Sequence, residues 1–226
     1  MNRVLATILG ITILAIGLSQ FCERPVPVTV STPVIVTLDY AVSATVLLKV
    51  TTKDEIMGHG SGVLIDSCGT TLTARHMLDQ ADKIEVILAD GKSYAACNFW
   101  TSESADIGFC RIDPNGPTPY LYFASFPAML GETIRVIGAP CMPALSGTVT
   151  QGIISHVGRD TSQGFLFQLD ATGAPGNSGG PVLNMKNEIV GIMVAGIFPG
   201  GGINAAVPLE QIMAAYWDYL ESNCGR

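Results

Sequence analysis

The stretch Gly173-Ala-Pro-Gly-Asn-Ser-Gly-Gly-Pro181 surrounds one serine with four glycines, between two segments that are typical of β-strands. Glycine tolerates positive φ and lets the backbone approach a ligand closely, so this serine does not belong to a hydrophobic core. Successive N–H groups on such a turn can point to one spot and stabilise an oxyanion. We interpret Ser178 as a nucleophile and the N–H groups of Gly176 and Ser178 as its oxyanion hole. The alternative is a glycine-rich hairpin with an incidental serine.

A nucleophilic serine needs a base that takes its proton, and the chain has three histidines, His59, His76 and His156. The segment 176–180 also matches the G-x-S-x-G elbow of α/β-hydrolases, but in that motif the histidine follows the serine. No histidine follows residue 178, so the elbow interpretation fails. His76 comes just after a strand-like run, where an imidazole can be held rigidly and face a cleft. We expect His59 and His156 on solvated loops.

The acid that orients the base must be buried against the imidazole and stay ionised. Asp106 is the leading candidate, because it directly precedes the apolar run IGFCRI at 107–112. Other aspartates lie in polar turns or in a Pro/Gly loop, and we expect them to be surface charges: Asp79, Asp82, Asp90 and Asp113.

Short β-branched and aliphatic runs, separated by turn residues, fill most of the chain. They lie at 44–50, 60–66, 70–74, 83–88, 107–112, 132–139, 147–155, 165–170, 181–184 and 188–196. This spacing, without helical periodicity between the runs, predicts an all-β sandwich or barrel. The irregular stretch 113–127 contains four prolines and is expected to connect two groups of strands. The 25 glycines and 13 prolines also argue against a long-helix protein.

The end of the chain is the one segment with a helical pattern. Residues 208–222 predict a helix that begins at Pro208 and docks on the strands through one apolar face. That face is expected to carry Leu209, Ile212, Met213, Tyr216, Trp217 and Leu220.

Charge and composition exclude some functions. The formal net charge is −7 with 12 Lys and Arg in 226 residues, so no global field attracts phosphates and nucleic-acid binding is not expected. With 48% hydrophobic and 14% charged residues, the chain is too apolar for a disordered protein. There is no CxxC and no Cys–His spacing that suits zinc, so the sequence predicts no zinc site.

The N-terminus predicts export. Arg3 precedes the apolar run 4–18, which is the pattern of a signal segment. Two interpretations of residues 1–21 stay open. Cleavage after Ser19 would release the protein, whereas residues 4–21 are just long enough to anchor it in a membrane. In both cases the rest of the chain lies outside the cytoplasm, in a periplasmic or extracellular location. Residues 22–33 form a proline-containing linker.

Six motifs, in one order, resemble those of trypsin-like serine proteases, and most closely those of the HtrA/Deg branch. The motifs are GSGVLID (60–66), TLTARHML (71–78), ADIGFCRI (105–112), GNSGGPVLN (176–184), EIVGI (188–192) and INAAVP (203–208). The resemblance covers roughly residues 56–212 and implies a fold of two six-stranded β-barrels with the catalytic site in the cleft between them. It implies a protease domain at 34–226, with a first barrel at about 34–118, a second at about 125–208 and the helix after it.

The same resemblance implies a catalytic triad of His76, Asp106 and Ser178, and hydrolysis of polypeptide substrates through an acyl-enzyme. Most HtrA proteins carry a peptide-binding PDZ module after the protease part, and the expectation here is a chain without one. Arg75 stands where the family usually has a small residue or Asn, so a cation is expected near the rim of the cleft.

Specificity is also read from the resemblance. Trypsins that select basic side chains have an Asp six residues before the catalytic serine, and this position is Thr172 here. The segment Met193, Val194 and Ala195 is expected to form an apolar wall of the pocket. We therefore expect cleavage after small or medium aliphatic residues. Asp170 matches the HtrA pattern and is interpreted as structural.

Six cysteines in an exported chain permit three disulfides. In the family, the strands that carry Cys97 and Cys110 pair antiparallel, which makes these two the best candidates for a bridge. The other pairings, the oligomeric state and the natural substrate stay open.

Two other functions remain possible. The first is a protease-fold binding or chaperone-like protein with latent or low activity, since the sequence does not show whether loop 172–178 has the active geometry. The second is a hydrolase of esters instead of peptides, because the same triad would serve it.

Overall fold

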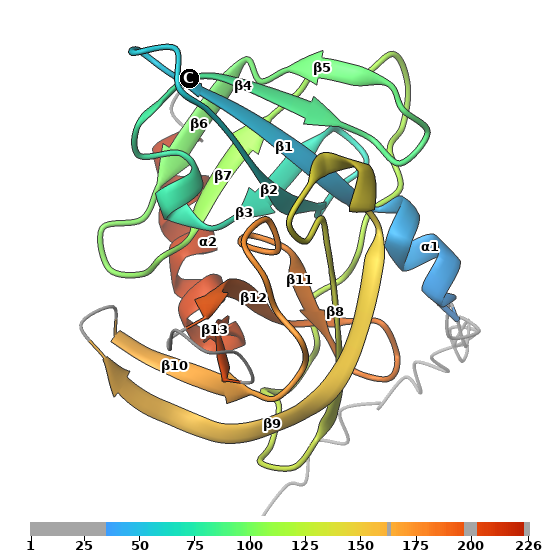
Figure 1. Ribbon diagram of the computed structural model, residues 1–226, viewed down its shortest axis with the longest axis vertical. Helices are drawn as coiled ribbons and strands as arrows, with labels where there is room; N and C mark the ends of the chain where they lie inside the picture. The colour runs from blue at the N-terminus through green and yellow to red at the C-terminus, as the bar shows by residue number, and fades with distance from the viewer. Residues whose placement is uncertain (1–34, 162–163, 197–202, 224–226) are drawn as a thin grey trace, which may run out of the picture. The chain divides into compact units, whose positions relative to one another are not determined.

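A computed structural model describes residues 35–161, 164–196 and 203–223 (Figure 1). These ranges do not include the predicted export segment, the linker up to residue 33, Cys22 or Cys224. Within the described ranges, no helix has the length and apolar character needed to cross a membrane.

The first half of the described chain forms one antiparallel seven-stranded sheet in the order β5-β4-β1-β2-β3-β7-β6. Its strands are β1 (Thr45–Thr52), β2 (Met57–Leu64), β3 (Thr70–Thr73), β4 (Ala81–Ile87), β5 (Ser93–Ala95), β6 (Asn98–Thr101) and β7 (Gly108–Arg111). The prediction for this half was a six-stranded barrel. The structure instead has a seven-stranded sheet, because the short strands β5 and β6 pair at its two edges. Neither lies in a run that the sequence marked as a strand.

The second half forms a closed barrel in the order β10-β13-β12-β11-β8-β9, which confirms the predicted six strands there. Its strands are β8 (Thr133–Gly138), β9 (Thr148–Thr161), β10 (Gly164–Leu169), β11 (Pro181–Leu183), β12 (Ile189–Gly196) and β13 (Asn204–Pro208). The irregular stretch between β7 and β8 bonds to both halves: Leu121 N–H donates to Leu64 O at 3.0 Å, and Ala124 N–H donates to Ile189 O at 2.9 Å.

Two α-helices accompany the strands. The prediction that only the end of the chain is helical is wrong, because α1 (Leu38–Ser43) precedes β1. Thr37 caps α1 by accepting a hydrogen bond from the N–H of Tyr40 at 3.2 Å, which satisfies one of the free donors at the helix start. Single 3₁₀ turns lie at η1 (Arg75–Met77) and η2 (Pro143–Leu145).

The C-terminal helix α2 (Leu209–Asn223) confirms the predicted element and corrects its buried face. Leu209, Ile212 and Ala215 are buried, but the Trp217 side chain is 60% exposed and faces solvent. Tyr219 takes the expected place of Trp217, and its ring stacks on Phe109 of β7 at a centroid distance of 4.7 Å. The helix thereby fastens the barrel's last strand to the first sheet.

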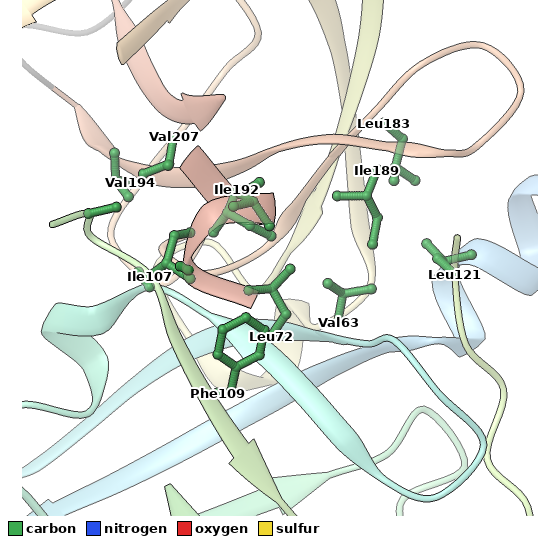
Figure 2. Close-up of a cluster of buried hydrophobic side chains, with 14 of the residues drawn as sticks. Val63, Leu72, Ile107, Phe109, Leu121, Leu183, Ile189, Ile192, Val194 and Val207 are labelled. Carbon is green, nitrogen blue, oxygen red and sulfur yellow. The ribbon is translucent and has the colours of Figure 1, made fainter. Parts of the chain in front are cut away.

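The two sheets share one hydrophobic cluster (Figure 2). Val63, Leu72 and Phe109 come from the first sheet, while Ile192 and Val207 come from the barrel, and all five side chains are fully buried. Dense packing of this kind resists deformation, so residues at the edges of this cluster keep fixed relative positions.

Candidate active site

His76 lies where the first sheet ends and the chain turns outward. Every residue of β3 is buried, so the strand is fixed, and η1 then lifts His76 away from the sheet. The imidazole is 42% exposed. A rigid base with an open face can reach a substrate, as the sequence suggested for this residue.

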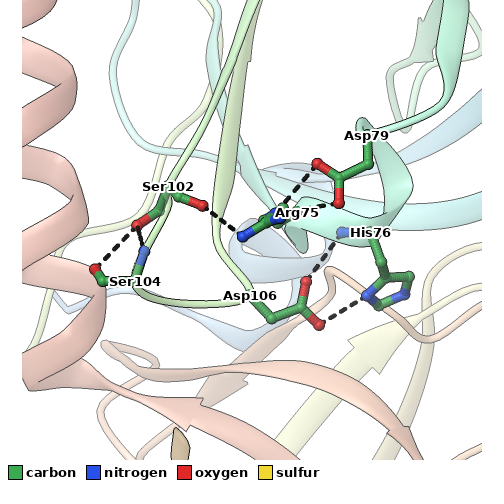
Figure 3. A network of polar contacts seen from close by, with 6 residues as sticks. All are labelled: Arg75, His76, Asp79, Ser102, Ser104 and Asp106. Carbon is green, nitrogen blue, oxygen red and sulfur yellow. Dashed lines mark hydrogen bonds and ion pairs between the residues drawn. The ribbon is translucent and has the colours of Figure 1, made fainter. Parts of the chain in front are cut away.

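The carboxylate of Asp106 binds His76 at two points (Figure 3). Oδ1 accepts from the backbone N–H of His76 at 2.9 Å, and Oδ2 lies 2.8 Å from Nδ1. Because an ionised carboxylate only accepts, the proton between them sits on Nδ1, and Nε2 is left as an acceptor when the ring is neutral. The structure therefore brings together the pair that the sequence pointed to.

Asp106 is ionised although it is 9% exposed. Burial raises the pKa of Asp106, but the hydrogen bonds and charge of His76, with a smaller effect of Arg75, outweigh it. The net result is a pKa below the usual range.

Arg75 is tied back instead of entering the cleft freely. Its Nε lies 3.1 and 3.2 Å from the two carboxylate oxygens of Asp79, and its Nη1 donates to Ser102 O at 3.0 Å (Figure 3). The cation is paired with Asp79, and sequence reasoning did not predict this pairing.

Ser178 lies on a tight turn that packs against the strand leading to His76. Gly179 has φ +84°, and a Cβ added there would lie 2.1 Å from both Ser61 O and Thr73 Oγ1 and 3.0 Å from Ala74 N. Only glycine permits this approach, which sets the serine turn directly against the end of β3. Within the described part of the chain, Ser178 Oγ has no hydrogen-bond partner; free enzymes often show such loose contacts.

The peptide groups around Ser178 have fixed orientations. Pro175 O accepts from Cys141 N–H at 2.7 Å, and Asn177 O accepts from Gly180 N–H at 2.9 Å. In a planar trans peptide the N–H points opposite to its C=O, so the N–H groups of Gly176 and Ser178 are directed away from these partners. Neither N–H donates to any group among the described residues, which leaves both available to a ligand.

The expected pocket residues differ in exposure. Thr172 is exposed, and its carbonyl accepts from Thr150 Oγ1 at 2.9 Å. Met193 and Val194 are buried in core clusters, and a Cβ at Gly173 would lie 2.4 Å from Met193 Cε. These two side chains therefore support the loop from below. The backbone of Ala195 belongs to β12, and its side chain lies outside the described part.

Asp170 has a structural contact. Its Oδ1 accepts from the backbone N–H of Ile153 at 2.6 Å, so the carboxylate joins the chain after β10 to β9.

His59 and His156 are not on loops, which corrects the sequence prediction. His59 lies in β2, where pairing with β1 overrides the loop-like glycines around it, and its Nε2 is 3.1 Å from Ala139 O. His156 lies in β9 and accepts through Nδ1 from Gly158 N–H at 3.1 Å.

The expected Cys97–Cys110 bridge is absent from the structure, in which both cysteines are free. Strands β6 and β7 do pair antiparallel, but Cys97 lies just before β6, and Cys110 of β7 lies opposite Phe99. Cys97 Sγ instead donates to Arg111 O at 3.2 Å. Cys68 and Cys141 are also free and exposed.

Cavities flank His76 and Asp106. One cavity of about 370 Å³ is lined by Arg75, Asp79, residues 103–106 and Gly164. Another of about 260 Å³ adjoins His76 and is lined by Met77 and residues of the β1–β2 hairpin. Among the described residues, no group of three or more His, Cys, Asp or Glu is arranged to hold a metal ion.

The fold and this site define the class of protein. The model of the trypsin-like peptidase domain matches residues 60–192, and the chain belongs to that family.

Within this family, the chain is similar to proteases of the HtrA and Deg type. HhoA of Synechocystis is 37% identical over 169 residues, which are 70% of this chain and 42% of that protein. The periplasmic pH-dependent serine endoprotease DegQ of Escherichia coli is 36% identical, over 67% of this chain and 35% of its own length. The chain thus spans less than half of these relatives.

Solved structures agree with this placement. The HtrA-type protease AlgW with a tripeptide superposes with a TM-score of 0.73 at 29% identity, covering 82% of this chain and 64% of that one. A serine endoprotease from Yersinia pestis gives a TM-score of 0.71 at 27% identity, covering 82% and 67%.

Proposed function

We propose that the protein is a serine endopeptidase that cleaves polypeptides through an acyl-enzyme, with His76, Asp106 and Ser178 as its catalytic triad. One observation carries the proposal. The hydrogen-bonded pair of Asp106 and His76 follows the strand end that the serine turn contacts at Ala74, and two N–H groups of this turn, which have no acceptor among the described residues, suit an oxyanion. The names of the relatives support peptide hydrolysis, since DegQ is an endoprotease and AlgW was solved with a tripeptide.

Acylation begins when Ser178 Oγ attacks the scissile carbonyl carbon while its proton passes to His76 Nε2. The carbonyl oxygen becomes an oxyanion that accepts hydrogen bonds from the N–H groups of Gly176 and Ser178. When the tetrahedral intermediate collapses, the C–N bond breaks and the leaving amine takes the proton from His76. Water then repeats the sequence with His76 as base, and the carboxylic acid leaves.

Asp106 serves this cycle without being protonated. By accepting Nδ1–H it holds the tautomer in which Nε2 receives the serine proton, and its negative charge stabilises the imidazolium that forms. The lowered pKa of Asp106 keeps it ionised at neutral pH.

Each step uses groups of the chain itself, so the proposed reaction needs no cofactor. A donor of the oxyanion hole contributes on the order of 3–4 kcal/mol in related chemistry.

We propose that cleavage follows small or medium aliphatic residues. Thr172 supplies no carboxylate, so a Lys or Arg side chain in the pocket would be buried without a partner, at a cost of several kcal/mol. Met193 and Val194 pack beneath the loop and keep its underside apolar, and Ala195 follows them along β12.

We also propose that the protein acts outside the cytoplasm. The basic start and the apolar run 4–18 support export, and DegQ is named as periplasmic. Residues 4–21 would supply any membrane attachment, which fractionation of cells with and without them would test.

A second candidate function is a protease-fold binding protein with low activity. It is favoured by the absence of a hydrogen bond from Ser178 Oγ to His76 among the described residues. In this case, polypeptides would bind the cleft without turnover.

Incubation of the full chain with a mixed-sequence peptide library, read by mass spectrometry, tests the proposal. We expect new termini after aliphatic residues, and none with Ser178→Ala. Intact peptides with bound material would support the binding protein. Hydrolysis of esters alone, in a parallel panel of acyl esters, would replace the peptidase by an esterase.

A further inference from the structure

Strand β2 presents two polar side chains to the turn that carries Ser178. His59 and Ser61 are two residues apart, so they lie on the same face of the strand. Sequence reasoning assigned His59 to a solvated loop and gave Ser61 no role. Their contacts converge on residues 139 and 176–178, which contain both donors of the proposed oxyanion hole.

Ser61 holds the turn at two carbonyls. Its N–H donates to Ser178 O at 2.8 Å, and its hydroxyl donates to Gly176 O at 2.7 Å. The same hydroxyl accepts from Ala139 N–H at 3.0 Å, so its donor and acceptor functions are both used. Ser61 is fully buried, so water does not compete for its hydrogen bonds.

His59 adds a second attachment to the same place. Its Nε2 donates to Ala139 O at 3.1 Å, since a carbonyl oxygen can only accept. A Cβ added at Gly176 would lie 2.5 Å from this Nε2, which means that the imidazole packs directly against Gly176. The ring therefore blocks the space into which the Gly176 peptide would otherwise rotate.

Such support matters because the turn is rich in glycine. Gly176 has φ +101°, and glycine loses more conformational freedom on ordering than any other residue. An oxyanion donor is effective only if it already points to the place where charge develops. A displaced peptide at 175–176 would remove one N–H from the hole without disturbing the His76–Asp106 pair.

We propose that Ser61 and His59 are positioning residues for the oxyanion hole. Ser61 holds the peptides that follow Gly176 and Ser178, and His59 packs against Gly176, so that the N–H groups of Gly176 and Ser178 stay directed to the substrate. The inference rests on the proposed function, and it adds residues that touch neither substrate nor His76. Their removal weakens stabilisation of the transition state and leaves binding of the ground state intact.

The test compares Ser61→Ala and the pair His59→Leu and His59→Gln in the full chain. Ser61→Ala lowers kcat about 100-fold, and His59→Leu about tenfold, with KM changed by less than about twofold. His59→Gln restores most of kcat because its amide donates to Ala139 O again.

A peptide aldehyde separates positioning from general destabilisation. It forms a hemiacetal with Ser178 whose oxyanion uses the hole, so its affinity falls by the same factor as kcat. The affinity of a product peptide, which makes no oxyanion, stays constant. Thr45→Val is the matched control: the Thr45 hydroxyl is also buried and donates to Ala41 O at 3.0 Å, but it lies away from the turn. We expect this control to keep kcat.

Unchanged kcat and aldehyde affinity in both Ser61→Ala and His59→Leu would overturn the inference. If Ser61→Ala does not fold, the difference between His59→Leu and His59→Gln decides. Failure of the proposed function is distinguishable, because the parent itself would then neither hydrolyse peptides nor bind the aldehyde at Ser178.

Discussion

Replacement of Asp106 by Asn tests the role of the most buried charge in the site. In the parent, both carboxylate oxygens accept from His76, at 2.9 Å from its N–H and at 2.8 Å from Nδ1. Asn keeps an oxygen for the backbone N–H, so the fold is preserved. Its NH₂ group then faces Nδ1, and two donors cannot share one hydrogen bond.

The imidazole therefore adopts the tautomer with its proton on Nε2, so that Nδ1 accepts a hydrogen bond from the new amide. In this tautomer Nε2 cannot take the Ser178 proton. The known cost of this error in a serine triad is about 10⁴ in kcat. At 1.36 kcal/mol for each factor of ten, this is about 5 kcal/mol of transition-state stabilisation.

The assay is initial-rate hydrolysis of a cleaved library peptide at neutral pH, by the parent, Asp106→Asn and Asp79→Asn. Asp79 is the matched control, because its carboxylate binds Arg75 next to His76 but does not touch the imidazole. We expect less than about a threefold change for this exposed pair. A loss under tenfold in folded Asp106→Asn would refute the tautomer argument.

Three further outcomes are expected. Because the pKa of Asp106 is lowered in the folded state, its contribution to stability is present above the unfolded pKa of about 3.9 and is lost as pH falls through the folded value. Denaturant titrations from pH 6 to acid should therefore show a smaller loss of unfolding free energy for Asp106→Asn than for the parent. An equal dependence of the unfolding free energy on pH in the two proteins would contradict this. Gly179→Ala combines strain at φ +84° with a contact of 2.1 Å between the new Cβ and Ser61 O. Thermal or urea unfolding should show that the free energy of unfolding falls by at least about 3 kcal/mol, and an unchanged value would mean that the turn lies elsewhere. Burial raises the pKa of the Cys110 thiol to about 12, so iodoacetamide should modify the exposed Cys68 and Cys141 at least about 100-fold faster than Cys110. Mass spectrometry measures the three rates, and equal rates would show that Cys110 is accessible.

Five of the barrel's six strands could be predicted from sequence because they overlap apolar runs that end at turn residues, whereas β13 was marked only by the family motif INAAVP. Strands β8, β11 and β12 fall close to the predicted runs. The missed strands β5 and β6 have three and four residues, too few to show an alternating pattern. Helix α1, with six residues, has fewer than two turns, which is too short to show a repeating helical pattern.

The limits of pattern reasoning also appear in α2. An apolar stripe predicted Trp217 in the buried face, but its neighbour Tyr219 is the residue that stacks on Phe109. A helix face about 100° wide cannot be oriented from hydrophobicity alone when aromatic residues stand on both sides.

For the site, residue chemistry identified His76 and Asp106 as partners, and the structure places them in contact. It could not identify Ser61 or His59. Their contacts span 78 to 117 residues of sequence and depend on how the two sheets pack. The flanking glycines of β2 resemble a loop, although seven of its residues pair with β1.

The central claim is that Ser178 is an activated nucleophile, and covalent labelling tests it most directly. The full chain is treated with a fluorophosphonate, and the modified peptide is identified by mass spectrometry, beside Ser178→Ala and His76→Ala. The account predicts labelling at Ser178 in the parent, none in Ser178→Ala and very little in His76→Ala. Two results would contradict it: a folded parent protein that takes up no label, or equal labelling of the parent and His76→Ala.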